Sequence, residues 1–331
     1  MNIKNWKCLV ITFILCLSLA QLSFAAETAA EGDVKWYEMG LKSFEEEKLI
    51  DKLMEGRNYQ REENDSNGWV SISCGEEYLG YGAGKLSYQK NDTSSTEGDL
   101  IFSFPLGLRG ESKETARDQD KIEELSSWLM EICLTSENEQ MNLVKSESYT
   151  AQQIQVQLDK ALEYDDTLSG IIGNGVFKDY SKYVTFEYEL SYERIPVMGY
   201  HELPEGFYMD IAAPTPVYIH GLVGDGSLIY LNMQGLFETK GSEKASMISQ
   251  DEAQKTAMDS IADFIPDGSV KLKENRLEYV PIPDWNSTSE APQKLVPYWY
   301  FEFEAEDENG ETITQPVRIN AMTGGDLSYG E

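Results

Sequence analysis

The chain has two histidines, the side chains best suited to exchange a proton or bind a metal near neutral pH. His201 lies beside Glu202 and Glu205, so one interpretation of this segment is a metal ion held by an imidazole and two carboxylates. His220 lies in a strand-like segment, where a half-buried structural role is expected. Because no further ligands stand at metal-binding spacing, we predict no metal site and no catalytic histidine.

Carboxylates are abundant, and paired carboxylates hydrolyse glycosidic bonds or bind calcium. Asp165-Asp166 and Asp307-Glu308-Asn309 lack the ligand spacing of a calcium loop, so we interpret both as solvated turns. The sequence contains no His-Glu-x-x-His, no Gly-x-Ser-x-Gly and no glycine-rich phosphate loop. It therefore predicts no catalytic residues and no cofactor, with a cell-wall hydrolase that uses paired carboxylates as the competing class.

Cys74 and Cys133 are the two cysteines that follow the first 25 residues. In an oxidising compartment they can form a disulfide, which would close a loop of about 60 residues and stabilise the fold by about 4 kcal/mol in the chain-entropy model. Two unpaired buried cysteines are an equal alternative, because distance along the sequence does not determine distance in space. Neither arrangement predicts redox catalysis, since there is no Cys-x-x-Cys.

Aromatic side chains occupy both faces of one expected strand, Tyr298 to Phe303. One face is expected to pack on a helix. Tyr298 and Tyr300 lie on the other face, where they either contact a second packed layer, the favoured alternative, or form an exposed docking surface for a protein or peptide. These two tyrosines are the interaction surface that the sequence suggests.

The chain carries 58 acidic and 27 basic residues, a formal net charge of −31 over 331 residues. Such a chain is repelled by phosphate backbones and by anionic lipid headgroups. We therefore predict no nucleic-acid partner, whereas cations, basic peptides and basic proteins stay open. The acidic excess also suits an exported protein that must stay soluble.

Residues 1–25 have the pattern of a secretory signal peptide. Lys4 and Lys7 form a basic start, an apolar run follows, and Ser23-Phe24-Ala25 is a small-x-small site for cleavage before Ala26. We therefore expect a secreted protein. The alternative is an uncleaved membrane anchor, because the apolar run is nearly long enough to span a bilayer.

Residues 26–180 are expected to form an N-terminal region that mixes helices and strands. The expected helices are Leu41–Met54, Ser112–Cys133 and Tyr149–Leu162, and the expected strands are Trp69–Ser73, Leu79–Gln89 and Leu100–Phe104, with a polar loop at Lys90–Gly98.

Residues 181–245 change to a period of two, which is typical of strands. From Tyr183 to Tyr192 one face is apolar and aromatic, and the other is mostly polar. Gly224-Asp225-Gly226 predicts a turn between two further strands. The expected elements after Tyr192 are the strands Tyr208–Ile211, Pro216–Leu222 and Ser227–Met233, and a linker at Ser242–Ala245.

Residues 246–331 predict one helix followed by an antiparallel hairpin. Ser249 and Glu252 have the spacing of a capping box, which starts a helix that runs to about Ile265. A strand is expected from Val270 to Pro281, and Asn309-Gly310 is a strong hairpin signal. The apolar stripe of the helix is Ala253, Ala257, Ile261 and Phe264, and the hairpin strands are Tyr298–Phe303 and Thr312–Ile319.

Two motifs resemble known families. Phe186 to Val197, followed by Asp225-Gly226, resembles the first subdomain of the thermolysin-type propeptide, although Arg194 stands where that family usually has Gly. Ile248 to Ala257, with Trp299 and the ending Ile319–Gly325, resembles a PepSY domain, with Asn320 in place of the family's Asp. The likeness spans less than half of the chain that follows the signal.

These resemblances imply an α+β fold in which antiparallel sheets are each packed with a helix. The residue patterns give a signal peptide (1–25) and an N-terminal α+β region (26–180), and the resemblances add a propeptide-like subdomain (181–245) and a PepSY-like helix-plus-hairpin domain (246–331). The families implied are exported proteins of Gram-positive gut bacteria and, more distantly, the YycH/YycI regulators, which keep an N-terminal anchor and restrain a cell-wall sensor kinase. We expect a non-enzymatic exported binding or regulatory protein, with the anchored regulator as an alternative.

Overall fold

The computed structural model describes residues 34–54, 58–64, 68–103, 116–134, 136–164, 177–199, 217–261, 270–283, 292–306 and 312–326. Several predicted features lie outside these residues: the signal peptide, His201 with Glu202 and Glu205, both acidic turns, the strand Tyr208–Ile211, and Phe264. Over the described ranges, no helix has the length and apolar character needed to cross a membrane.

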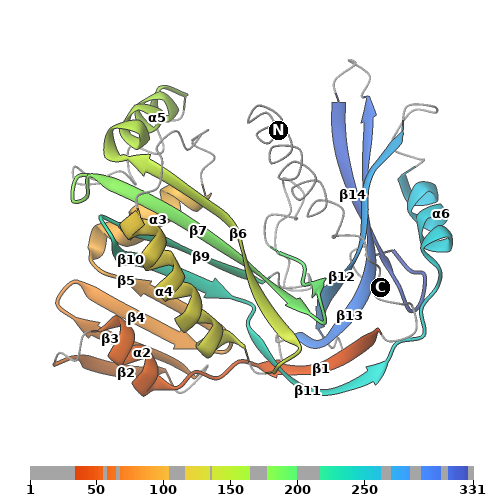
Figure 1. Ribbon diagram of the computed structural model, residues 1–331, viewed down its shortest axis with the longest axis horizontal. Helices are drawn as coiled ribbons and strands as arrows, with labels where there is room; N and C mark the ends of the chain where they lie inside the picture. The colour runs from red at the N-terminus through yellow and green to blue at the C-terminus, as the bar shows by residue number, and fades with distance from the viewer. Residues whose placement is uncertain are drawn as a thin grey trace, which may run out of the picture. The chain divides into compact units, whose positions relative to one another are not determined.

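The chain divides into two compact units. The larger one takes Trp36–Glu243 and Leu277–Tyr298, and the smaller one takes Lys244–Arg276 and Trp299–Leu327. Antiparallel sheets dominate both, with helices packed on them, so the predicted α+β class is confirmed at this level (Figure 1).

The larger unit contains a nine-stranded sheet in the order β2-β3-β4-β5-β10-β9-β7-β6, with β8 paired to β7 (Figure 1). Its strands are β2 (Gln60–Asn64), β3 (Trp69–Cys74), β4 (Glu77–Gly82), β5 (Lys85–Gln89), β6 (Glu139–Thr150), β7 (Lys182–Tyr192), β8 (Ile195–Pro196), β9 (Tyr218–Gly224) and β10 (Ser227–Gln234). Within the described residues, the helices of this unit are α2 (Glu46–Leu53), α3 (Asp92–Ser103), α4 (Ala116–Cys133) and α5 (Ala151–Tyr164).

A second sheet has the order β11-β1-β13-β12, and β14 also pairs with β13. Its strands are β1 (Lys35–Leu41), β11 (Phe237–Lys244), β12 (Lys271–Pro283), β13 (Pro292–Glu306) and β14 (Thr312–Asn320). Helix α6 (Gln250–Ile261) follows β11 in the chain.

Strand β7 is buried on both faces. On one face, the hydroxyls of Tyr188 and of Ser126 in α4 are hydrogen-bonded. On the other face, Tyr183 lies in an apolar cluster with Leu100 of α3 and Ile154 of α5. The strand itself was predicted, but the face expected to be polar is buried as well, because α3 and α5 cover it.

The predicted boundary near residue 180 does not separate two sheets. Strand β6 precedes it and β7 follows it, and the two pair from Glu139↔Tyr192 to Thr150↔Lys182. Strand β5 likewise pairs with β10. The regions that the sequence analysis treats as separate therefore share one sheet, because strand pairing joins segments far apart in the chain.

Residues expected as a polar loop and the strand Leu100–Phe104 instead form helix α3. The side chain of Asn91 accepts hydrogen bonds from the backbone N–H of Ser94 (2.8 Å) and from its hydroxyl (2.6 Å), which caps the helix start. Leu100 is fully buried against the sheet. The prediction was wrong because Ser, Thr, Asp and Gly are weak helix formers, and here capping and tertiary packing outweigh local propensity.

The segment expected as one strand, Leu79–Gln89, is the β4–β5 hairpin. Ala83 (φ 48°) and Gly84 (φ 72°) form its two-residue turn. At Gly84 a Cβ would lie 2.1 Å from the carbonyl oxygen of Leu236, so glycine is required there by space as well as by φ.

Five strands of the described structure were not predicted: β1, β2, β6, β8 and β11. Strand β6 is mostly exposed between Asn142 and Lys145, and β11 is exposed from Lys240 to Lys244, so neither shows the alternation that marks a half-buried strand. The expected linker Ser242–Ala245 overlaps the end of β11, and the first residues of the expected helix Leu41–Met54 give way to β1 and a connection before α2.

The smaller unit follows the predicted order of helix, strand and hairpin. The Glu252 backbone N–H donates to the Ser249 hydroxyl over 3.3 Å, as a helix cap requires. Ala253, Ala257 and Ile261 are buried. The Trp299 indole N–H donates to the carbonyl oxygen of Ile248 over 3.3 Å, so this ring lies on the side of the sheet where α6 begins.

We predict that Trp299→Ala destabilises the smaller unit by about 3 to 5 kcal/mol, because it removes a buried aromatic ring and its hydrogen bond. Phe301→Ala, two residues along the same strand face, should have a similar effect. The exposed Lys271→Ala should change the free energy of unfolding by no more than about 0.5 kcal/mol. Thermal unfolding followed by circular dichroism measures all three, and equal melting temperatures would contradict the helix-on-sheet packing.

Candidate functional site

Three lysines from three different elements line one pocket in the larger unit. Lys52 comes from α2, Lys121 from α4, and Lys90 from the residue after β5. The pocket volume is about 120 Å³. The remaining lining residues are Leu53, Tyr88, Leu125, Gly226, Ser227 and Leu228.

Two helices bring Lys52 and Lys121 together. Ion pairs join α2 to α4 at Lys48–Glu131 (3.3 Å) and at Lys52–Glu124, so the two helices run antiparallel. Each helix also buries its apolar face, which includes Leu53 in α2 and Leu125 in α4. Both the charged and the apolar sides of the two helices therefore contribute to the pocket lining.

Two backbone contacts position the rest of the wall. The Lys90 N–H donates to the carbonyl oxygen of Ile229 over 2.9 Å, which holds Lys90 beside β10. The Asp225 carboxylate accepts from the backbone N–H of Ser181 (2.9 Å) and of Lys182 (3.1 Å). This anchors the β9–β10 turn, whose next residues are Gly226 and Ser227.

One carboxylate forms ion pairs with two of the lysines. Glu124 pairs with Lys52 and, over 3.1 Å, with Lys121, and these hydrogen bonds hold the pKa of Glu124 below its usual range. The side chains of Lys52 and Lys121 are only 27% and 23% exposed, so bulk water screens their charges less than at an open surface. Among the described residues, no carboxylate contacts the half-buried Lys90. The pocket thus has three positive charges and one nearby negative charge.

This arrangement suits a small anion. The volume exceeds the roughly 15 Å³ that one water needs, but it is below the roughly 300 Å³ of typical cofactor sites. Ammonium groups and the Ser227 hydroxyl can all donate hydrogen bonds to anionic oxygens. The site can therefore hold a carboxylate, phosphate or sulfate group, with the bulk of a larger ligand outside the pocket.

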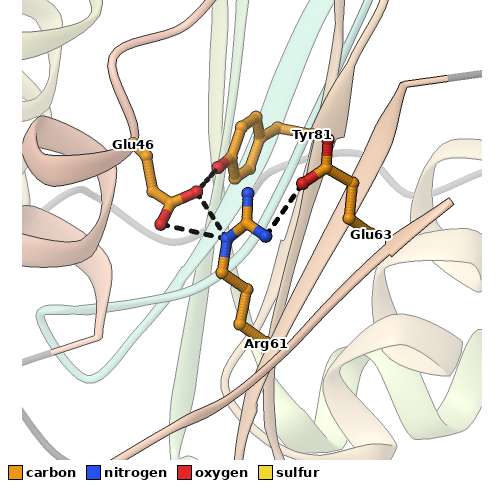
Figure 2. Close-up of polar contacts among 4 residues, drawn as sticks. All are labelled: Glu46, Arg61, Glu63 and Tyr81. Carbon is orange, nitrogen blue, oxygen red and sulfur yellow. Dashed lines mark hydrogen bonds and ion pairs between the residues drawn. The ribbon is translucent and has the colours of Figure 1, made fainter. Parts of the chain in front are cut away.

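A second polar cluster lies at the start of α2, where one guanidinium pairs with two carboxylates. Figure 2 shows the Arg61 guanidinium between Glu46 and Glu63: Arg61 Nε lies 3.0 Å from Glu46 Oε2, and Nη1 lies 2.9 Å from Glu63 Oε2. The Tyr81 hydroxyl also donates to Glu46. Burial acts to raise the pKa of Glu46, but these hydrogen bonds outweigh it and lower that pKa. Because its charges are paired, this cluster fixes α2 on β2 and β4 rather than binding a ligand.

Tyr298 and Tyr300, predicted as a possible interaction surface, are buried, with exposed fractions of 6% and 4%. Tyr300 lies between two guanidinium groups, with the Cζ of Arg276 4.0 Å and that of Arg318 4.9 Å from the ring centroid. Its hydroxyl donates to Glu302 over 2.9 Å. The exposed docking surface is therefore corrected to a packed layer, because basic side chains from β12 and β14 cover Tyr300.

The two cysteines are free thiols in the structure. Cys74 ends β3 and is partly buried, whereas Cys133 ends α4 and is fully buried. The sulfur of Cys133 lies 3.8 Å from that of Met233, and burial raises the pKa of its thiol to about 12. Cys133 therefore acts as a small apolar core residue.

His220 belongs to a ring stack on β9. Its ring is parallel to that of Phe102 in α3 at 4.1 Å, and it also stacks with Tyr218 at 4.9 Å. The expected half-buried structural position matches this placement. No group of His, Cys, Asp and Glu with the proximity needed to hold a metal occurs among the described residues.

Glu97 is a buried acid that the sequence analysis missed. It lies in α3, and one of its oxygens accepts hydrogen bonds from the Phe177 N–H (2.8 Å) and the Tyr183 hydroxyl (2.9 Å). Burial raises the pKa of Glu97, and these two hydrogen bonds only partly oppose the shift. Leu100, Phe177 and Tyr183 belong to the buried core cluster, so the two hydrogen bonds hold Glu97 against an apolar and aromatic core.

No protein-family model matches this chain, and no curated protein matches it. The functional argument therefore depends on the site. Lys52, Lys90 and Lys121 were not predicted as site residues, because they share no motif and lie on elements brought together only by the tertiary fold.

We predict that Glu97→Gln reduces the dependence of stability on pH. The folded protein holds the Glu97 proton more tightly than the unfolded chain, so the stability that this proton provides is lost as pH rises from about 4.5 toward neutral. Urea unfolding at pH 4.5 and pH 7 should show a smaller loss for Glu97→Gln than for wild type. Glu123→Gln, exposed on α4, removes one charge and serves as the control. Parallel curves for Glu97→Gln and Glu123→Gln would contradict this account of Glu97.

Proposed function

We propose that this protein is an exported, non-enzymatic binding or regulatory protein that holds an anionic group in the pocket of Lys52, Lys90 and Lys121. One observation carries the proposal: three lysines converge on a small pocket in a chain with a net charge of −31. Like charges repel, so their convergence raises the free energy of the empty pocket. A bound anion offsets that cost.

The lining favours binding over catalysis. Of the described residues that line the pocket, none carries an imidazole, a thiol or a carboxylate, three of the groups used in general acid–base or nucleophilic chemistry. Besides the lysines, the lining consists of three leucines, Tyr88, Gly226 and Ser227. A cell-wall hydrolase with paired carboxylates stays the competing class, and the site that would support it is two facing carboxylates in a cleft.

The sequence pattern of residues 1–25 supports an extracytoplasmic location, with cleavage before Ala26. The resemblance to propeptide-like and PepSY-like modules supports a regulatory role for the later part of the chain. A membrane-anchored relative of the YycH/YycI regulators is the alternative if residues 1–25 are retained.

The net charge of −31 on the chain selects against large anions. Repulsion by the negative charges of the chain slows the approach of any polyanion. A small anion is repelled less, because salt at physiological ionic strength screens charges over roughly 8 Å. Nucleic acid is therefore not a proposed ligand. The partner class we propose is a small molecule or an exposed chain end that bears one compact anionic group.

We predict that Lys90→Gln weakens the binding of inorganic phosphate about tenfold, because it removes the lysine that no described carboxylate contacts. Lys85→Gln removes the same charge from an exposed position at the start of β5, outside the pocket, and it should keep wild-type affinity. Isothermal titration calorimetry at low salt measures both. An equal loss in the two variants would assign the effect to net charge and contradict a pocket site.

A further inference from the structure

The charges around the pocket match a ligand of defined valence. Lys52, Lys90 and Lys121 supply three positive charges, and Glu124 neutralises one of them by bridging Lys52 and Lys121. Among the lining lysines and their ion-pair partner, positive charges therefore exceed negative ones by two. A singly charged carboxylate would leave one positive charge unbalanced in a partly desolvated position, whereas a dianion balances both.

The arrangement of the hydrogen-bond donors also favours a dianion over a carboxylate. Planar carboxylates are recognised best by the fork of arginine, which donates two parallel hydrogen bonds. Here the donors are lysine ammonium groups, which act as point charges, and they approach from α2, α4 and the end of β5. Separate directions of approach suit the oxygens of a tetrahedral group, and Ser227 on the β9–β10 turn adds a hydroxyl.

We propose that the pocket binds a doubly charged tetrahedral oxyanion, the dianion of a phosphate monoester. This inference rests on the proposed function and narrows it from any anionic group to one chemical class. The Lys52, Lys90 and Lys121 ammonium groups bind the oxygens, and Glu124 competes with the ligand for two of those ammonium groups.

Other ionisable groups near the pocket are already engaged. Tyr88 lines the wall, but its hydroxyl donates to the buried Glu77 over 3.0 Å. Asp225, beside Gly226, accepts from the Ser181 hydroxyl (2.7 Å) and from the backbone of Ser181 and Lys182. The hydrogen bonds from Lys52 and Lys121 hold the pKa of Glu124 below its usual range, which favours its ionised form. The protonation of the ligand therefore governs how binding responds between pH 5 and pH 7.5.

Three probes test the ligand class: methyl phosphate, sulfate and acetate, each titrated calorimetrically into the full chain at pH 7.5 and pH 5.0. The second ionisation of a phosphate monoester lies near pH 6, so about one-tenth of it is dianionic at pH 5. We expect methyl phosphate to bind about tenfold more weakly at pH 5.0 than at pH 7.5. Sulfate, a dianion at both pH values, should bind equally at both, and acetate at least tenfold more weakly than sulfate.

Two results would overturn the inference while leaving the proposed function intact. The first is that acetate binds as tightly as sulfate. The second is that both methyl phosphate and sulfate bind as tightly at pH 5.0 as at pH 7.5. A lack of binding by all three probes would instead overturn the proposed function. Failures of the two proposals are therefore distinguishable.

The variant Glu124→Gln removes the carboxylate that pairs with Lys52 and Lys121. Removing the bridging carboxylate frees both lysines for the ligand, so sulfate should bind about three- to fivefold more tightly. A gain of affinity cannot arise from partial unfolding. The exposed Glu123→Gln on the same helix removes one charge away from the pocket and should leave affinity unchanged. Weaker sulfate binding by Glu124→Gln would overturn the inference.

The same dianion can come from a soluble ester or from a lipid headgroup. Cosedimentation with phosphatidylcholine vesicles that contain phosphatidic acid distinguishes the two sources. We expect the acidic chain to stay in the supernatant, which supports a soluble ester as the source of the dianion. If the wild-type protein instead sediments with the vesicles and Lys90→Gln does not, the lipid phosphate is the source.

Discussion

The burial of β7 on both faces is the constraint on which the larger unit depends. Its side chains alternate between two separate cores: Tyr188 contacts α4, and Tyr183 contacts the cluster of α3 and α5. A shift of one residue in register would exchange these two sets, so the pairing with β6 and β9 must be kept. The other strands and the helices of the larger unit pack around β7 and its two neighbouring strands.

The lysine-lined pocket follows from that arrangement. Asp225 accepts hydrogen bonds from the residues at the start of β7, which fixes the β9–β10 turn and with it Ser227. The contact between Ser126 and Tyr188 fixes α4 on the other side of the same strand, and α4 carries Lys121. The pocket wall therefore rests on rigid elements, which is what a preorganised binding site needs.

The elements that could be predicted from the sequence are those with strong local periodicity. Helices α4, α5 and α6 and strand β7 repeat their apolar residues at the expected period, and they form where that pattern predicts. Helix α3 has weak helix formers and depends on the Asn91 cap and on tertiary contacts. The pocket has no local pattern at all, since ion pairs between α2 and α4 bring its lysines together. The burial of Tyr300 has a similar cause, because Arg276 and Arg318 come from strands on either side of it in the chain.

The central claim is that Lys52, Lys90 and Lys121 form a site for an anion. The most direct measurement is anomalous diffraction from crystals soaked in selenate, a tetrahedral dianion whose selenium can be located without a prior assumption about its position. The account predicts an anomalous peak in the pocket, with selenate oxygens within hydrogen-bonding distance of Lys90 Nζ and of the Lys52 or Lys121 ammonium group. An empty pocket in crystals that show selenate bound elsewhere on the protein would contradict it.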